Sequence, residues 1–68
     1  MIVIETNRVF AAYVRTNRRV RWQFAEYCGR WESLERAISE VKARTRGTFE
    51  YRIEDMSTGK IYQQVVTC

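Results

Sequence analysis

One stretch of the chain, residues 33–45, constrains the fold most strongly, because it alone repeats apolar side chains at helical spacing. Four apolar residues recur at i, i+3, i+4 and i+7 and so share one stripe of a helix: Leu34, Ala37, Ile38 and Val41. Ser33 is well suited to cap the free amides of the first turn. The pattern therefore predicts one amphipathic helix over Ser33–Thr45.

Charges support this helix along its outer face and at its end. Two acid-first pairs at i, i+4 spacing are expected to form salt bridges of about 0.2–0.5 kcal/mol each: Glu32 with Arg36, and Glu40 with Arg44. Gly47 lies just beyond the last periodic residue, where a residue with positive φ commonly ends a helix. We interpret the charged face as solvated rather than functional.

The segments on either side of the helix predict strands. We expect them at Ile2–Glu5, Val9–Arg15, Val20–Tyr27, Thr48–Asp55 and Ile61–Thr67. Gly29 is expected to break the chain before the helix, and Gly59 to provide positive φ in a hairpin turn. Phe49, Tyr51 and Ile53 alternate with charged residues, so they are expected to point inward.

The hairpin between Val9–Arg15 and Val20–Tyr27 has two candidate registers. With a loop at residues 16–18, one face carries Phe10, Ala12, Val14, Val20, Trp22 and Phe24, and the other carries Tyr13, Arg15, Arg19, Arg21 and Gln23. With a loop at residues 17–18 alone, the pairing shifts by one and this segregation worsens. We adopt the first register.

These elements predict an α+β fold. Its single antiparallel sheet is βββαββ, or ββαββ if the first segment merges with the second, with one helix packed on one face. The 68 residues form one domain, residues 1–68. A chain of this size has a small core, which self-association often completes, so a homodimer is among the expectations.

Composition excludes several chemistries. The chain has no histidine, which removes the commonest general base and metal ligand, and its two cysteines, Cys28 and Cys68, cannot complete a zinc site. Glu50 and Glu54 are expected to face outward rather than into a catalytic cleft. The apolar run Met1–Ile4 is too short for export or for spanning a bilayer. We expect a cytoplasmic, non-enzymatic protein without cofactor, metal site or membrane contact.

A cluster of arginines is the strongest functional feature. The net charge is +4, and ten arginines accompany only two lysines. Guanidinium groups form forked hydrogen bonds with phosphates and carboxylates, and arginine is favoured at recognition surfaces. The expected binding residues surround the tip of the first hairpin: Tyr13, Arg15, Arg18, Arg19, Arg21 and Gln23.

The second half of the chain resembles a known class of proteins. The matching stretches are Glu32-Ser33-Leu34-Glu35-Arg36-Ala37-Ile38, Gly47-Thr48, Arg52-Ile53-Glu54 and Gly59-Lys60. They are similar to the helix, strand and hairpin of small phage-encoded anti-CRISPR proteins of the type I-F class. The resemblance transfers no functional residue. It implies an inhibitor, acting in the host cell cytoplasm, that docks on a CRISPR surveillance complex and interferes with its handling of DNA.

Three functional hypotheses follow. The first is a phage-type inhibitor that docks on a host protein or nucleoprotein complex through the arginine hairpin. The second is a module for DNA or RNA in which Arg15, Arg19 and Arg21 contact phosphates while Tyr13 stacks on a base or positions it. The third is a structural dimer whose arginines only keep it soluble.

Overall fold

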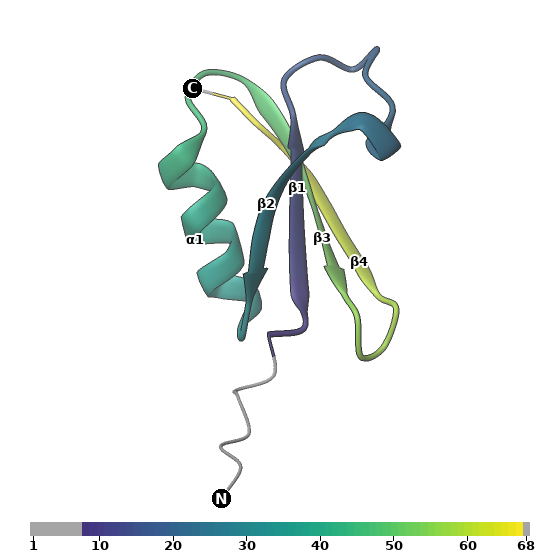
Figure 1. Cartoon of the computed structure of the whole chain (residues 1–68). Coiled ribbons are helices and arrows are strands. Elements are labelled where there is room, and N and C mark those ends of the chain that lie inside the picture. Colours follow the sequence, from purple (N-terminus) through teal and green to yellow (C-terminus); the bar gives the residue numbers. More distant parts are fainter. Residues whose placement is uncertain (1–7, 68) are drawn as a thin grey trace, which may run out of the picture.

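An antiparallel sheet with one helix against it forms the protein, as the computed structural model shows for residues 8–67 (Figure 1). The elements, in chain order, are β1 (Phe10–Arg15), a 3-10 turn η1 (Trp22–Phe24), β2 (Glu26–Trp31), α1 (Leu34–Arg44), β3 (Phe49–Asp55) and β4 (Ile61–Val66). The strands lie in the order β2-β1-β3-β4. The predicted α+β class is confirmed, in its ββαββ form for these residues. The expected strand Ile2–Glu5 lies outside the described residues.

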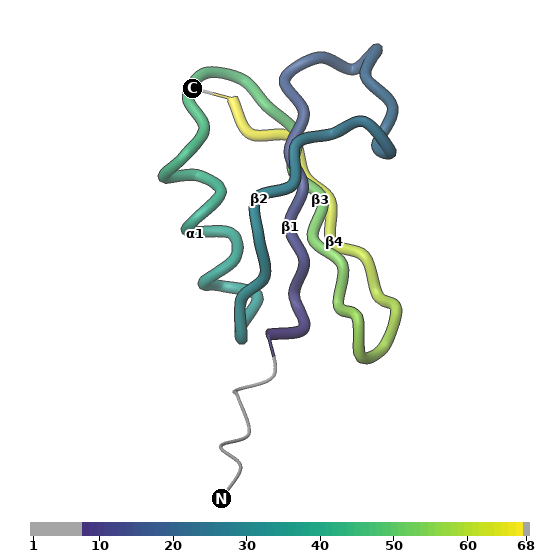
Figure 2. The backbone as a smooth tube through the Cα atoms, in the orientation of Figure 1, coloured from purple at the N-terminus to yellow at the C-terminus, as the bar shows by residue number. Residues whose placement is uncertain are grey.

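The helix and the loop of residues 16–25 lie on opposite sides of the sheet. Figure 2 shows α1 beside β2 at one side and the 16–25 loop at the other, next to the ends of the strands. The helix contacts β1, β2 and β3. The sheet face turned away from α1 is therefore not covered by the helix, and we call it the open face.

The predicted helix is confirmed nearly residue for residue. Ser33 has extended backbone angles, and its hydroxyl accepts a hydrogen bond from the amide of Arg36 at 3.1 Å. Gly47 has a φ of 79°, two residues beyond the cap at Thr45.

One of the two predicted helix salt bridges is present and the other is wrong. Glu40 pairs with Arg44 at 3.6 Å, but Arg36 also turns toward Glu40, at 3.2 Å, instead of toward Glu32. Glu32 precedes the cap at Ser33, so it lies outside the helix and the i, i+4 rule does not apply to it.

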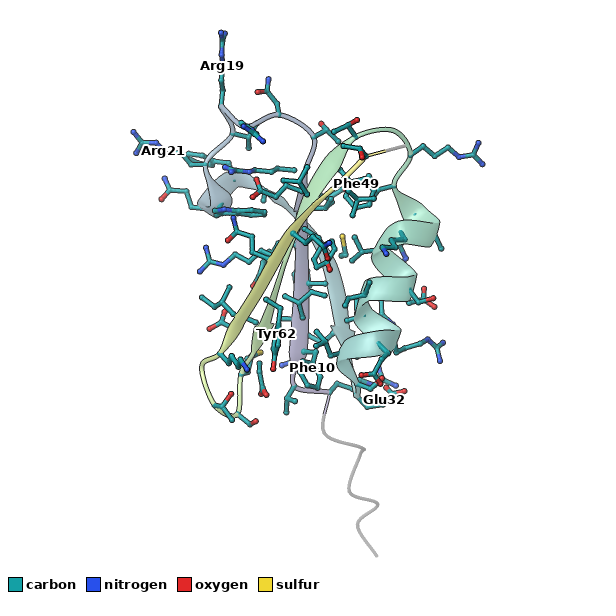
Figure 3. All side chains as sticks on the ribbon, turned by 180° about the vertical axis from the view of Figure 1, so that it is seen from behind. Phe10, Arg19, Arg21, Glu32, Phe49 and Tyr62 are labelled. Atoms are coloured by element: carbon teal, nitrogen blue, oxygen red, sulfur yellow. The ribbon has the colours of Figure 1, made fainter. Side chains whose placement is uncertain are left out.

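The hydrophobic core lies between α1 and one face of the sheet. The buried residues that form it are Ala12, Val14, Ala37, Val41, Phe49, Tyr51 and Ile53. The inward direction of Phe49, Tyr51 and Ile53 is therefore confirmed. The positive φ predicted for Gly59 in the β3–β4 turn is also confirmed, at 80°. In Figure 3, Phe49 lies between the sheet and the helix.

The predicted strand Val20–Tyr27 is wrong, together with the register of its hairpin with Val9–Arg15. Residues 20–25 form an irregular segment with the 3-10 turn, and β2 begins only at Glu26. Phe10 pairs with Trp31, and Gly29, expected to be a break, lies inside β2 with a φ of 127° beside a bulge. This arrangement packs Trp31 against the core immediately before the helix. The longer loop that it requires between β1 and β2 costs little additional closure entropy.

Candidate functional site

The open face carries a mixture of charged, aromatic and apolar side chains. The strand registers assign to it Ala11, Tyr13 and Arg15 from β1, Glu50, Arg52 and Glu54 from β3, and Ile61, Gln63 and Val65 from β4. Tyr27 joins them from β2, with its ring centroid 5.4 Å from that of Tyr13. Aromatic rings and cations therefore share the sheet face that the helix does not cover.

Local hydrogen bonds give the 16–25 loop a defined shape. The carbonyl of Asn17 accepts from the amide of Val20 at 3.0 Å, and its side-chain oxygen accepts from the amide of Arg19 at 2.9 Å. The amide of Phe24 then donates to the carbonyl of Arg21 at 2.8 Å. Figure 3 shows Arg19 and Arg21 pointing away from the body of the protein, where both are exposed to solvent.

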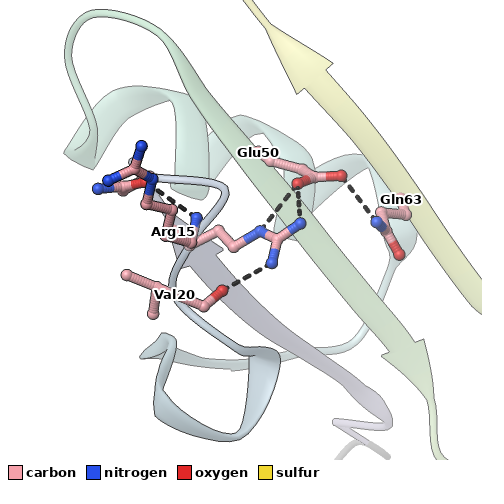
Figure 4. Close-up of polar contacts among 6 residues, drawn as sticks. Arg15, Val20, Glu50 and Gln63 are labelled. Carbon is pink, nitrogen blue, oxygen red and sulfur yellow. Dashed lines mark hydrogen bonds and ion pairs between the residues drawn. The ribbon is translucent and has the colours of Figure 1, made fainter.

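Arg15 fastens this loop to the sheet (Figure 4). Its Nε and Nη2 donate to Glu50 Oε1 at 2.9 and 2.6 Å, and its Nη1 donates to the carbonyl of Val20 at 2.7 Å. Its guanidinium lies 4.4 Å from the ring centroid of Trp22. The Arg15 and Glu50 side chains are only 15% and 14% exposed. Arg15 therefore acts first as an anchor within the protein.

A depression of about 590 Å³ lies between the loop and the open face. Its walls are formed by Tyr13, Arg21, Trp22, Gln23, Ala25, Arg52 and Glu54. The guanidinium of Arg52 lies 5.9 Å from the Trp22 ring, so the indole is held beside two arginines, Arg15 and Arg52. The depression offers aromatic rings for stacking and cations for an anionic group.

The structure brings together part of the residue set predicted from sequence. Tyr13, Arg21 and Gln23 meet in the depression, while Arg18 and Arg19 lie on the exposed loop outside it. Arg15 lies beneath the loop in the ion pair with Glu50.

Sequence reasoning missed four residues of the depression: Trp22, Ala25, Arg52 and Glu54. Trp22 shares a face with Val20 and Phe24 in the predicted strand Val20–Tyr27, and the structure does not form that strand. Arg52 faces outward, as its alternation with Tyr51 and Ile53 predicts, and its position opposite Tyr13 depends on the pairing of β1 with β3, for which the sequence carries no local signal.

Metal binding, thiol chemistry and membrane crossing find little support in the part of the chain that the structure describes. No group of three or more histidine, cysteine, aspartate or glutamate residues is placed to hold a metal ion. Burial, followed by the charge of Glu26, raises the pKa of the Cys28 thiol, which disfavours the reactive thiolate. In residues 8–67, no helix has the length and hydropathy needed to cross a membrane.

Glu50 makes the stability of the site dependent on pH. Hydrogen bonds from Gln63 and then Arg15 lower the pKa of Glu50 below its ordinary value of 4.5. A lowered pKa in the folded state contributes stability that is present above the unfolded pKa and is lost as the pH falls through the folded pKa. We expect the difference in unfolding free energy between the parent and Glu50→Gln to be constant at neutral pH and to shrink below about pH 4.5.

Urea unfolding of both proteins across acidic pH checks this expectation. The Asp55 carboxyl, whose pKa is lowered by Ser57, titrates in both proteins and so cancels in the difference. A difference that stays constant to the lowest pH would show that Glu50 has no preferential interaction in the folded state.

Comparisons of the chain with protein families, with curated proteins and with solved structures found no match.

Proposed function

We propose that the protein is a non-enzymatic module that binds single-stranded nucleic acid across the open face and the 16–25 loop. The observation that carries this proposal is the depression in which Tyr13 and Trp22 stand beside Arg21 and Arg52. Proteins that bind single strands combine a basic surface that follows the phosphates with aromatic side chains on which unpaired bases stack. An antiparallel sheet covered by a helix on only one face is a suitable scaffold for this arrangement.

The exposed arginines of the loop also favour nucleic acid as the partner. Arg18, Arg19 and Arg21 are exposed, and the structure records no ion pair for any of the three among the described residues. They are therefore available to phosphates, and guanidinium groups bind phosphate oxygens in forked geometry. Arg15 contributes indirectly, because it holds the loop while its own charge is balanced by Glu50.

A salt titration tests the electrostatic part of the proposal. The probe is a fluorescently labelled single-stranded oligonucleotide of about 12 nucleotides, within the site sizes known for such domains. For the variant Arg18→Ala/Arg19→Ala/Arg21→Ala we expect weaker binding and a salt slope lower by about 2, since each phosphate contact on a single strand contributes about 0.7. Fluorescence anisotropy at several salt concentrations measures both quantities.

A second triple variant provides the matched control. Arg36→Ala/Lys42→Ala/Arg46→Ala removes the same charge from exposed residues in and just after α1. It is expected to bind nearly as tightly as the parent. Equal loss in the two variants would mean that net charge alone drives binding, and no binding by the parent at low salt would end the nucleic-acid proposal.

Tryptophan fluorescence tests the stacking part. The chain has two tryptophans, and Trp31 lies on the core side of the sheet, within 5.2 Å of the Arg44 guanidinium. In Trp31→Phe the remaining Trp22 signal is expected to be quenched by the oligonucleotide. Trp22→Leu is expected to lose about 1–3 kcal/mol of binding free energy, the usual contribution of one stacked base.

A protein partner is the second candidate, favoured by the exposure of Phe24. This side chain is 72% exposed at the end of η1, beside the exposed arginines of the loop. Aromatic and arginine side chains are common anchors of protein-binding surfaces. In this alternative the protein is an inhibitor that docks on an acidic surface of a host protein or nucleoprotein complex. Loss of oligonucleotide binding in Arg18→Ala/Arg19→Ala/Arg21→Ala but not in Phe24→Ala would favour the first candidate.

A further inference from the structure

The outer edge of β4 lacks the features with which proteins usually prevent an edge strand from pairing with another strand. β4 is the last strand of the described sheet, and its residues, Ile-Tyr-Gln-Gln-Val-Val, carry no charge. The other three strands each contain at least one charged residue. Exposed edges are commonly blocked by charges, proline or bulges, because their free backbone groups pair with other strands. The composition of β4 provides none of these blocks.

The β3–β4 ladder determines which backbone groups of β4 point outward. The amide of Asp55 donates to the carbonyl of Lys60 at 2.8 Å, so this pair closes the hairpin with a direct hydrogen bond. Pairs alternate along an antiparallel ladder. The N–H and C=O groups of Ile61, Gln63 and Val65 therefore point away from β3, while those of Tyr62 and Gln64 point toward it.

We propose that this edge pairs with β4 of a second copy of the chain, antiparallel and centred on Gln63. In this register Gln63 faces Gln63 of the second copy, and Ile61 faces Val65 on either side. All three outward-pointing residues then exchange backbone hydrogen bonds with their counterparts. Registers centred on Tyr62 or Gln64 leave Val65 or Ile61, respectively, without an equivalent partner in the strand. The edge is thus complementary to itself.

The side chains fit this pairing. Ile61 and Val65 are 43% and 39% exposed, and a β-branched pair opposite each other is favourable on a sheet surface. One proton of the Gln63 amide nitrogen bonds to Glu50 at 2.7 Å, which leaves the second proton and the amide oxygen for the facing Gln63. The helix lies toward the β2 side of the sheet, away from the β4 edge (Figure 1).

The resulting dimer has a two-fold axis perpendicular to the sheet. Such an axis keeps both open faces on one side and both helices on the other, so the two open faces join into one longer surface. The contact is smaller than the roughly 800 Å² per partner of a standard interface, so we expect a weak dimer, with Kd in the micromolar to millimolar range. Because each copy carries a charge of +4, added salt should strengthen the dimer by screening repulsion.

Sedimentation equilibrium without nucleic acid tests this proposal independently of the proposed function. We expect the parent to shift from monomer to dimer over micromolar to millimolar concentrations, more readily at higher salt. Amide hydrogen exchange gives the register: the amides of Ile61, Gln63 and Val65 should become protected as concentration rises. A monomer at every concentration, with these amides exchanging freely, would overturn the proposal and leave the edge to some other strand.

Two substitutions at the axis sharpen the test. Gln63→Lys retains a partner in Glu50 but places two cations face to face, and we expect dimerisation to weaken about tenfold or more. Gln63→Pro removes an outward amide without removing a ladder bond to β3, and should have a similar effect. Ser39→Lys adds the same charge on the exposed helix surface and should have almost none. Equal dimerisation in the parent and both Gln63 variants would rule out this register.

Discussion

Ile53→Ala is expected to remove most of the stability of the protein. Ile53 is completely buried in the centre of β3, paired with Ala12 on one side and Tyr62 on the other. Truncating a buried isoleucine to alanine typically costs about 2–5 kcal/mol, because the surrounding core only partly fills the cavity. A 68-residue domain is stable by only roughly 3–10 kcal/mol. Urea denaturation followed by far-UV circular dichroism measures the loss.

Ile61→Ala is the matched control for this substitution. It deletes the same atoms from the neighbouring strand, but Ile61 is 43% exposed and its side chain lies on the open face. We expect a change within about 0.5 kcal/mol, as for most surface substitutions, when unfolding is measured at low protein concentration. A loss from Ile53→Ala no larger than that from Ile61→Ala would contradict the position of the core.

Periodicity predicted the second half of the fold because burial there is one-sided. The stripe that contains Ala37 and Val41 faces the sheet, and both residues are fully buried. Phe49, Tyr51 and Ile53 alternate with charged residues and occupy the inner face of β3. In such elements every local preference agrees with the packing, so the hydrophobic pattern alone is sufficient to predict the element and its buried face.

The same reasoning failed for Val20–Tyr27 because alternation is not specific to core strands. Val20, Trp22 and Phe24 have the spacing of a strand, yet Phe24 is 72% exposed and Trp22 lies beside Arg15. The true β2 contains Gly29 at positive φ, and a glycine in a strand weakens the sequence signal for it. Its position is determined by packing against β1 and α1, which a local window does not contain.

The candidate site was only partly predictable for a similar reason. The arginine-rich loop is visible in composition, and Tyr13, Arg21 and Gln23 do line the depression. Arg52 completes it from a strand that is distant in sequence, through the pairing with Tyr13. The role of Arg15 also depends on Glu50, its partner across β1 and β3. Such long-range pairs follow from strand order rather than from any motif.

Arg15→Ala is expected to loosen the whole 16–25 loop and to destabilise the domain by about 1–3 kcal/mol. The substitution removes the arginine donor to the Val20 carbonyl and to Glu50 Oε1, leaving Glu50 with the bond from Gln63 alone, and it removes the cation beside Trp22. Oligonucleotide binding should weaken as well, although Arg15 is largely covered and its charge is balanced by Glu50. Urea unfolding together with amide exchange of the loop measures both effects. Arg18→Ala, which removes an exposed charge, should leave stability and exchange unchanged.

Two further variants distinguish an anchor from a phosphate ligand at this position. Arg15→Lys keeps the charge but lacks the planar fork that reaches Glu50 and Val20 together, so it should recover only part of the stability. A double-mutant cycle with Glu50→Gln should give a coupling free energy of about 0.5–3 kcal/mol, as expected for residues in direct contact. If Arg15→Ala instead lowered the salt slope of binding while stability stayed at the parent value, Arg15 would be a nucleic-acid contact. In the anchor role, the stability of the domain and the shape of its binding loop depend on the same guanidinium.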